Sequence, residues 1–183
     1  PEGFKHNEQS VRVVEYLEKD GRGLNLTREV IDGILHHSGF SKTSKKAYTL
    51  EGQIVKYSDK IAYVNHDIDD SIRAGILSIE DVPQELIKVL GESHGKRIGN
   101  LVEDMISTTL KNIENNVIEV ALSAEIDEAL TELRKFLFKE VYTGAFLREE
   151  REKAKFVLHH VFEYYYKHPE EMPDLYKTVV EAQ

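Results

Sequence analysis

The sequence predicts an all-helical fold, and three observations support this class. Residues that break helices are scarce, with 11 glycines and 4 prolines among 183 residues. No segment alternates apolar and polar residues over the length of a strand, whereas several long segments repeat apolar residues every three or four positions, as one face of a helix requires. The uneven lengths of these segments argue against a simple up-and-down bundle.

Capping residues set the expected helix boundaries. Thr27 and Thr49 are suitable N-caps, because a threonine oxygen accepts a hydrogen bond from the first free amides of a helix. Ser123 has the same role later in the chain, and Gly75 is suited to end the helix that Thr49 begins. Helices are expected, in chain order, over residues 7–19, 28–37, 50–74, 83–91, 95–115, 124–142 and 146–167, with a last one after Pro173.

Composition narrows the class of protein. Apolar residues make up 40% of the chain and no apolar run approaches the ~18 residues of a membrane-spanning helix, so a membrane protein is not expected. The absence of cysteine excludes a disulfide framework and a cysteine zinc site, and it fits a cytoplasmic location. A net charge of −9 disfavours binding to nucleic acid or to anionic membranes, except through a local pocket.

The helix expected over residues 50–74 carries the strongest functional signal. One side is predicted to pack in the core, and its residues are Leu50, Ile54, Tyr57, Ile61, Val64, Ile68 and Ile72. The opposite arc holds Asp59, Tyr63, His66, Asp67 and Asp70, with Lys60 at its edge. Such an arc is ordinarily a solvated face.

Three residues of this arc favour a binding site over a solvated face. Asp59, Tyr63 and Asp67 stand one helical turn apart, in steps of about 6 Å, so they can reach along a ligand as long as a nucleotide. The two carboxylates suit a metal ion and a hydroxyl, and the ring suits a sugar or a base. A divalent metal needs several ligands, however, and the sequence alone does not show the partners of Asp59.

Two further polar groups are each open to two interpretations. His36 and His37 stand at a helix C-terminus, where an imidazolium interacts favourably with the helix dipole, or they line a pocket. His94, Lys96 and Arg97 begin a helix, where positive charge is mildly unfavourable. They are therefore interpreted either as a solvated turn or as a phosphate-binding or nucleotide-binding group.

The last long helix carries an apolar stripe of Phe156, Val157, Val161 and Tyr164. Its neighbouring histidines, at 159 and 160, and its three successive tyrosines, at 164–166, are interpreted as a packed aromatic seam rather than as a ligand site.

Three segments carry a resemblance to a known family. The string TLEGQIVKYSDKIAYVNHDIDD (49–70) resembles the HD-domain deoxynucleoside triphosphate triphosphohydrolases, the dGTPase-like family. The opening GFKHNEQS (3–10) and the stretch GILHHSG (33–39) match that family in order and spacing. The resemblance implies an HD-superfamily multi-helix domain, present in part: residues 1–75 are the C-terminal part of the catalytic core, and residues 76–183 form a helical region packed on it.

The resemblance also implies an activity. Family members use a divalent metal, such as Mg²⁺ or Mn²⁺, to hydrolyse a deoxynucleoside triphosphate to a deoxynucleoside and inorganic triphosphate. It implies that Asp59 is a metal ligand, that Lys60 binds phosphate and that Tyr63 packs against the deoxyribose. Asp67 then accepts a hydrogen bond from the 3′-hydroxyl. Family members commonly form homo-oligomers, so the implied partners are a deoxynucleoside triphosphate and further copies of the chain.

The N-terminal segment departs from the family pattern. His6, Asn7 and Gln9 are either a helix cap and first turn or groups that organise the metal loop. The family's first His, its His-Asp doublet and its catalytic-acid His precede this element, so these groups are expected ahead of Pro1. The pair at 36–37 is no substitute, because no Asp follows it. The chain is therefore expected to be a piece of a longer polypeptide and to be inactive alone, with its catalytic residues unknown.

Alternative functions remain open on the sequence. One is another HD-superfamily nucleotide phosphohydrolase, acting on a monophosphate or on a signalling nucleotide. A second is a catalytically inactive nucleotide-binding or regulatory module, and a third is a helical interaction scaffold. Nucleic acid is not expected as a partner, except in a regulatory role.

Overall fold

The computed structural model describes residues 3–39, 44–145, 147–174 and 176–177. All regular structure in this part of the chain is helical, which confirms the predicted fold class. The main helices are α1 (His6–Arg12), α2 (Glu18–Gly21), α3 (Arg28–Leu35), α4 (Leu50–Arg73), α5 (Gln84–Leu90), α6 (His94–Glu114), α7 (Ala124–Leu137) and α8 (Arg148–Lys167). Shorter turns are η1 (Val13–Leu17), η2 (Ile79–Asp81), η3 (Phe138–Tyr142) and η4 (Pro169–Glu171).

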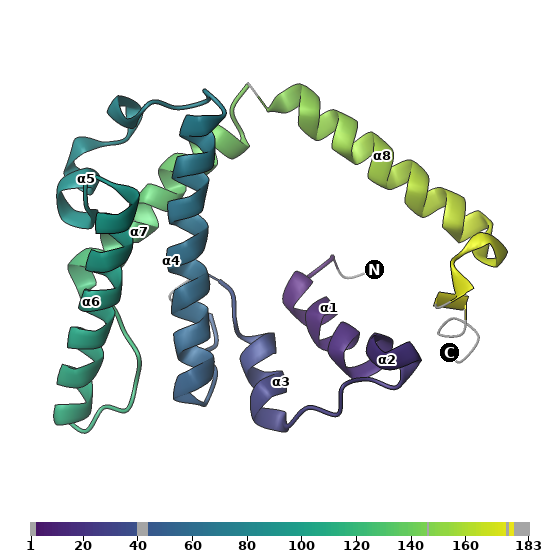
Figure 1. Ribbon diagram of the computed structural model, residues 1–183, viewed down its shortest axis with the longest axis horizontal. Coiled ribbons are helices and arrows are strands. Elements are labelled where there is room, and N and C mark those ends of the chain that lie inside the picture. The colour runs from purple at the N-terminus through teal and green to yellow at the C-terminus, as the bar shows by residue number, and fades with distance from the viewer. Residues whose placement is uncertain (1–2, 40–43, 146, 175, 178–183) are drawn as a thin grey trace.

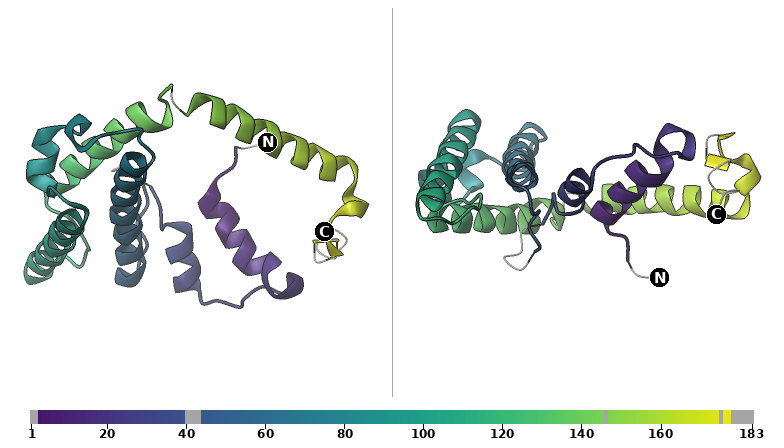
Figure 2. Two further views of the ribbon diagram at one scale, coloured as in Figure 1. Left: turned by 45° about the horizontal axis from the view of Figure 1, so that its top comes forward. Right: turned by 90° about the horizontal axis from the view of Figure 1, so that it is seen from below.

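The helices form one packed group with two extensions (Figure 1). In the group, α4 packs against α6 and α7, and α5 packs between them, so the group includes residues on both sides of the predicted boundary at residue 75. On the other side of α4, α3 contacts α4 and α1 contacts α3. Beyond η3, α8 runs away from the group on the side where α1 and α3 lie (Figures 1 and 2). No helix of the described part combines the length and the apolar character that crossing a membrane requires.

Most of the predicted boundaries are confirmed by the capping geometry. The hydroxyl oxygens of Thr27 and Thr49 accept hydrogen bonds from the amides of Val30 and Gly52, at 3.5 and 3.1 Å. Ser123 precedes α7 as predicted, but its side chain makes no cap bond. Gly75 follows α4 with a φ of 69°, a value that favours glycine. The expected final helix lies largely outside the described residues.

The core lies between α4, α5, α6 and α7. Its fully buried members include Val64 and Ile68 of α4, Leu90 of α5, Leu101 of α6 and Leu130 of α7. Burying a leucine of this kind contributes roughly 1.5–3 kcal/mol to folding. The site helix α4 is therefore fixed along its middle and C-terminal part by the other three.

The predicted core face of α4 is partly confirmed: Ile61, Val64 and Ile68 are buried as predicted. Ile54 and Ile72, expected in the core, are 44% and 36% exposed. Lys56 and Lys60 are buried instead, and Lys56 Nζ donates to Ser44 Oγ at 2.8 Å and to the Lys45 carbonyl at 3.0 Å. Polar partners on neighbouring segments thus allow two lysines outside the predicted core face to be buried.

The apolar stripe of α8 is exposed in the described structure. Phe156, Val157, Val161 and Tyr164 are all exposed, and no described residue of α8 is buried. Aromatic residues contact one another along the helix, as in the stacked pair of Phe162 and Tyr166 with ring centroids 6.1 Å apart, and Tyr164 also contacts η4 through Glu171. The aromatic seam therefore forms within one helix.

Two glycines bring α3 close to α4. A Cβ added to Gly33 would lie 3.6 Å from Gly52 Cα, and one added to Gly52 would lie 2.5 Å from Ala47 Cβ and 3.2 Å from Gly33 Cα. A side chain at position 52 therefore overlaps the segment that joins α3 to α4. This close approach positions the C-terminal end of α3 beside the N-terminal half of α4.

Gly52→Ala is expected to lower the free energy of unfolding by about 1–3 kcal/mol, because the added methyl overpacks the contact with Ala47. Gly99→Ala is the matched control, since a Cβ there meets nothing within 4 Å. It should raise stability by up to about 1 kcal/mol through helix propensity. Urea denaturation followed by circular dichroism measures both, and equal effects of the two changes would contradict the close packing.

Candidate functional site

A hollow of about 950 Å³ lies between α1, α3 and α4. We call it the α3–α4 hollow; it is lined by Ser10, Glu29, Val30, Gly33, Ile34, His37, Thr49, Glu51, Gly52, Val55, Ser58, Asp59 and Ala62. Two residues singled out from the sequence, Asp59 and His37, line the same hollow from different helices. Tyr63 and Asp67, which were predicted to line a binding site together with Asp59, are not among its lining residues.

Side chains at the start of the chain join α1 to the end of α3. Asn7 Nδ2 donates to the carbonyl of Leu35 at 2.8 Å, which satisfies one of the free acceptors at the C-terminus of α3. His6 Nε2 lies 3.2 Å from Ser38 Oγ, and its ring meets the His37 ring edge-on with centroids 5.2 Å apart. These contacts hold His37 against the hollow, while Gln9 lies half-buried on α1.

The neighbouring histidine has a structural partner. His36 follows α3, and its Nδ1 lies 2.9 Å from the Asp32 carboxylate one turn earlier. The backbone amide of Tyr48 donates to the same carboxylate at 2.9 Å. Both histidines therefore contact α3, since His37 Nδ1 lies 2.6 Å from the Ile34 carbonyl, and His37 also lines the hollow.

Tyr63 and Asp67 meet a residue that sequence reasoning missed. The hydroxyl of Tyr142, in η3, donates a hydrogen bond to Asp67 Oδ2. The rings of Tyr63 and Tyr142 are stacked, with centroids 6.2 Å apart and planes inclined by 19°. The guanidinium of Arg151, in α8, donates to the Tyr142 carbonyl. Tyr142 thus connects Tyr63 and Asp67 to the C-terminal part of the chain.

The protonation of this cluster is shifted by its surroundings. Burial raises the pKa of the Asp67 carboxyl above its ordinary value and the nearby Asp70 raises it further, although the bond from Tyr142 acts in the opposite direction. Burial and the bond to Asp67 also raise the pKa of the Tyr142 hydroxyl. Tyr142 therefore stays a hydrogen-bond donor throughout the neutral range.

Lys60 points to α7 rather than to the α3–α4 hollow. Its Nζ donates to Asp127 Oδ1 at 2.8 Å, and both side chains are largely shielded from solvent. The ammonium also lies 5.7 Å from the centre of the Tyr57 ring. The sequence places Lys60 at the edge of the polar arc, and the structure gives it an ion pair that joins α4 to α7.

Two of the three basic residues predicted at the start of α6 bind α4. Arg97 is buried; its Nε donates to Asn65 at 3.0 Å and its Nη2 to Asp69 at 3.2 Å. His94 Nδ1 lies 2.8 Å from the other oxygen of Asp69. Lys96 is exposed and pairs with Glu92 across one turn. The structure therefore gives Arg97 and His94 a packing role and leaves Lys96 on the surface.

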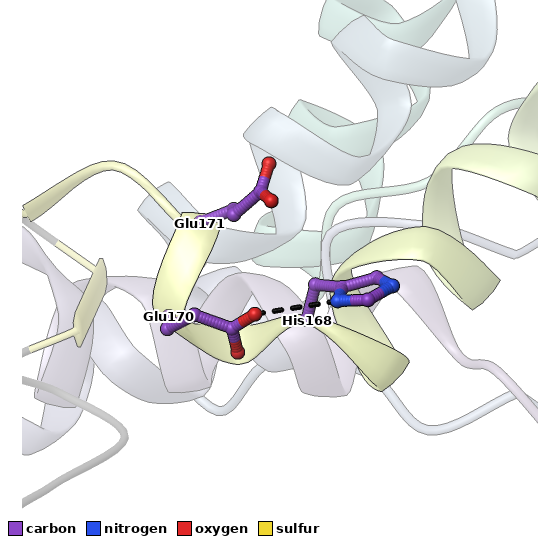
Figure 3. Close-up of side chains that lie close together, drawn as sticks. All are labelled: His168, Glu170 and Glu171. Carbon is purple, nitrogen blue, oxygen red and sulfur yellow. Dashed lines mark hydrogen bonds and ion pairs between the residues drawn. The ribbon is translucent and has the colours of Figure 1, made fainter.

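The described residues do not by themselves fit a complete divalent-metal site at Asp59. Within the described ranges, the His, Asp and Glu side chains close enough to share an ion are His168, Glu170 and Glu171, with ligand atoms within 4.8 Å of one another (Figure 3). These three are exposed and locally engaged: His168 pairs with Glu170 at 3.3 Å, and Tyr164 donates to Glu171. They follow the C-terminal end of α8 and lie in a different part of the fold from Asp59.

Comparison with known proteins shows which proteins this chain is similar to. Residues 120–183 match the phosphohydrolase-associated domain. A deoxyguanosinetriphosphate triphosphohydrolase-like protein of Clostridium tetani is 62% identical over 185 residues, which cover 100% of this chain and 53% of that protein. Similar proteins of Clostridium perfringens and Caldanaerobacter subterraneus are 58% and 51% identical, and the matches cover 54% and 50% of their lengths.

The all-helical fold is accompanied, over residues 120–183, by the match to the phosphohydrolase-associated domain. The resemblance to the dGTPase-like family is confirmed: the chain is related along its whole length to the deoxyguanosinetriphosphate triphosphohydrolase-like proteins. It spans about half the length of the curated relatives it matches.

Asp127→Asn is expected to lower the free energy of unfolding by about 1–3 kcal/mol, because it leaves the buried Lys60 ammonium without its carboxylate partner. Glu128→Gln changes an exposed carboxylate on the same helix, and its effect should stay within about 0.5 kcal/mol. Urea denaturation compares the two. Equal stabilities of both variants would contradict the ion pair.

Asp67→Asn is expected to stabilise the folded chain more near pH 7 than at about pH 4. The raised pKa of Asp67 means that folding favours its protonated form. The stabilisation of the folded chain by protonated Asp67 is present at low pH and is lost as the pH rises through the folded-state pKa of this carboxyl. Because Asp67 is partly exposed, the difference should be below about 1 kcal/mol. Urea titrations at both pH values measure this difference in stability. A larger gain in stability of the variant at the lower pH would contradict the raised pKa of Asp67.

Proposed function

We propose that this chain contributes the substrate-facing helix of a deoxynucleoside triphosphate triphosphohydrolase. The reaction converts a deoxynucleoside triphosphate and water to a deoxynucleoside and inorganic triphosphate. One observation carries the proposal: α4 presents Asp59 to a hollow and, one and two turns further on, presents Tyr63 and Asp67 to Tyr142. The names of the relatives support the same reaction class.

The aromatic pair suits the nucleoside end of the substrate. Tyr63 and Tyr142 present two nearly parallel rings, and flat apolar surfaces of this kind pack against a sugar or a base. The Asp67 carboxylate has further lone pairs beyond the one used by Tyr142, so it can accept a hydrogen bond from the 3′-hydroxyl. In this proposal Tyr142 orients Asp67 for that contact.

The phosphate end of the substrate lies toward Asp59. When bound, a divalent metal such as Mg²⁺ or Mn²⁺ polarises the phosphate and lowers the pKa of water. Asp59 would be one of its ligands, and the remaining ligands would come from the part of the relatives' length that this chain does not match. Lys60 can assist only if one of its three donors reaches a phosphate oxygen while another keeps Asp127. The proposed enzyme is cytoplasmic and homo-oligomeric.

The test uses a polypeptide with the full length of the relatives, incubated with dGTP and Mn²⁺. Inorganic triphosphate and deoxyguanosine are the expected products. Asp59→Asn should reduce their formation to background, because it removes a metal ligand and a charge from the hollow. Glu85→Gln, an exposed carboxylate on α5, is the matched control and should leave the rate unchanged.

Other products would contradict the proposal. Release of orthophosphate or pyrophosphate would instead favour another nucleotide phosphohydrolase. No turnover combined with a higher melting temperature in dGTP would favour an inactive nucleotide-binding module, because a ligand that binds only the folded state stabilises it.

A further inference from the structure

The C-terminal two-thirds of α8 expose apolar side chains on more than one face. Leu158, Phe162 and Tyr166 follow one another at four-residue intervals and are 70%, 70% and 78% exposed. We call these three residues the α8 ridge. Phe156 and Val157 lie on other faces of the same helix and are exposed as well. A helix that is apolar on several faces is typical of a buried helix, so α8 lacks a covering partner among the described residues.

The α3–α4 hollow is a second uncovered apolar surface. Val30 and Val55 line it from α3 and α4, and both are about half exposed. Two of the helices that form the hollow, α1 and α3, lie on the same side of the packed group as α8 (Figures 1 and 2). A single partner on that side can therefore cover both surfaces.

The relatives indicate which partner this is. They match nearly the whole of this chain with only about half of their own length, so each contains about as many additional residues as this chain has. The domain that includes α8, residues 120–183, is described as phosphohydrolase-associated. A second copy of this chain is the alternative partner that the test separates.

We infer that the α8 ridge docks, within one polypeptide, onto the half of the relatives' length that this chain does not match. The same segment covers the α3–α4 hollow. α8 is about 30 Å long at 1.5 Å per residue, enough to cross a small domain. This inference concerns assembly and rests on the family relationship, not on the proposed reaction.

Thiol labelling tests the inference, because the chain contains no cysteine of its own. Leu158→Cys and Phe162→Cys each place a thiol on the ridge. Lys153→Cys is the control: it is exposed and lies five positions before Leu158, so it faces another direction. Each variant is prepared both in the 183-residue chain and in a polypeptide with the full length of the relatives. Labelling rates are mapped by peptide mass, and circular dichroism checks folding.

In the 183-residue chain all three thiols should react at similar rates. In the longer polypeptide both ridge thiols should react at least about tenfold more slowly, while the control keeps its rate. Equal rates in the two polypeptides would overturn the inference. So would protection that disappears on dilution, because it would identify a second copy as the partner. Neither result bears on whether dGTP is hydrolysed.

Discussion

The hydrogen bond from Tyr142 to Asp67 connects residues 75 positions apart and fixes how the C-terminal part of the chain meets α4. Asp67 and Tyr63 lie one turn apart on α4, and Tyr142 touches both of them. Arg151 then binds the backbone of Tyr142 from α8. A change in any of these contacts alters both the candidate sugar-binding residues and the direction in which α8 leaves the packed group.

A second constraint on the structure is that the two sides of α4 have different surroundings. One side enters the core through Val64 and Ile68, and the other supplies Asp59 to the α3–α4 hollow. Between these sides, Lys60 is held by Asp127 of α7 and Asn65 by Arg97 of α6. These polar contacts specify the rotation of α4 about its own axis more sharply than apolar packing alone, since each buried polar group requires its partner.

The helical class and most helix ends could be predicted from the sequence, because these depend on local patterns and on capping chemistry. The candidate site on α4 was proposed from a local pattern as well. The prediction failed for Ile54 and Ile72, since apolar periodicity does not show which neighbours will surround a helix. It missed Tyr142 and Asp127 for a related reason. Nothing near either residue marks it, and only the tertiary fold brings it to α4.

The apolar stripe of α8 is apparent in the sequence, yet it is exposed in the described structure. Apolar periodicity states that a helix face needs cover, but it does not say whether that cover lies within the chain. The surroundings of His37 could not be predicted from the sequence either. Its position at a helix end was apparent, while its place in the hollow depends on Asn7 and His6 from α1.

The turn that carries Tyr142 has a consequence for how this architecture can vary. In η3 the amide of Thr143 bonds to the carbonyl of Phe138, five residues back, so the turn holds one residue more than an ordinary α-helical turn. Removing that residue would restore regular winding and rotate everything downstream by roughly 100°. Natural insertions and deletions should therefore be rarer in this turn than in the loops around it, because adding or removing one residue there changes the direction of the whole of α8.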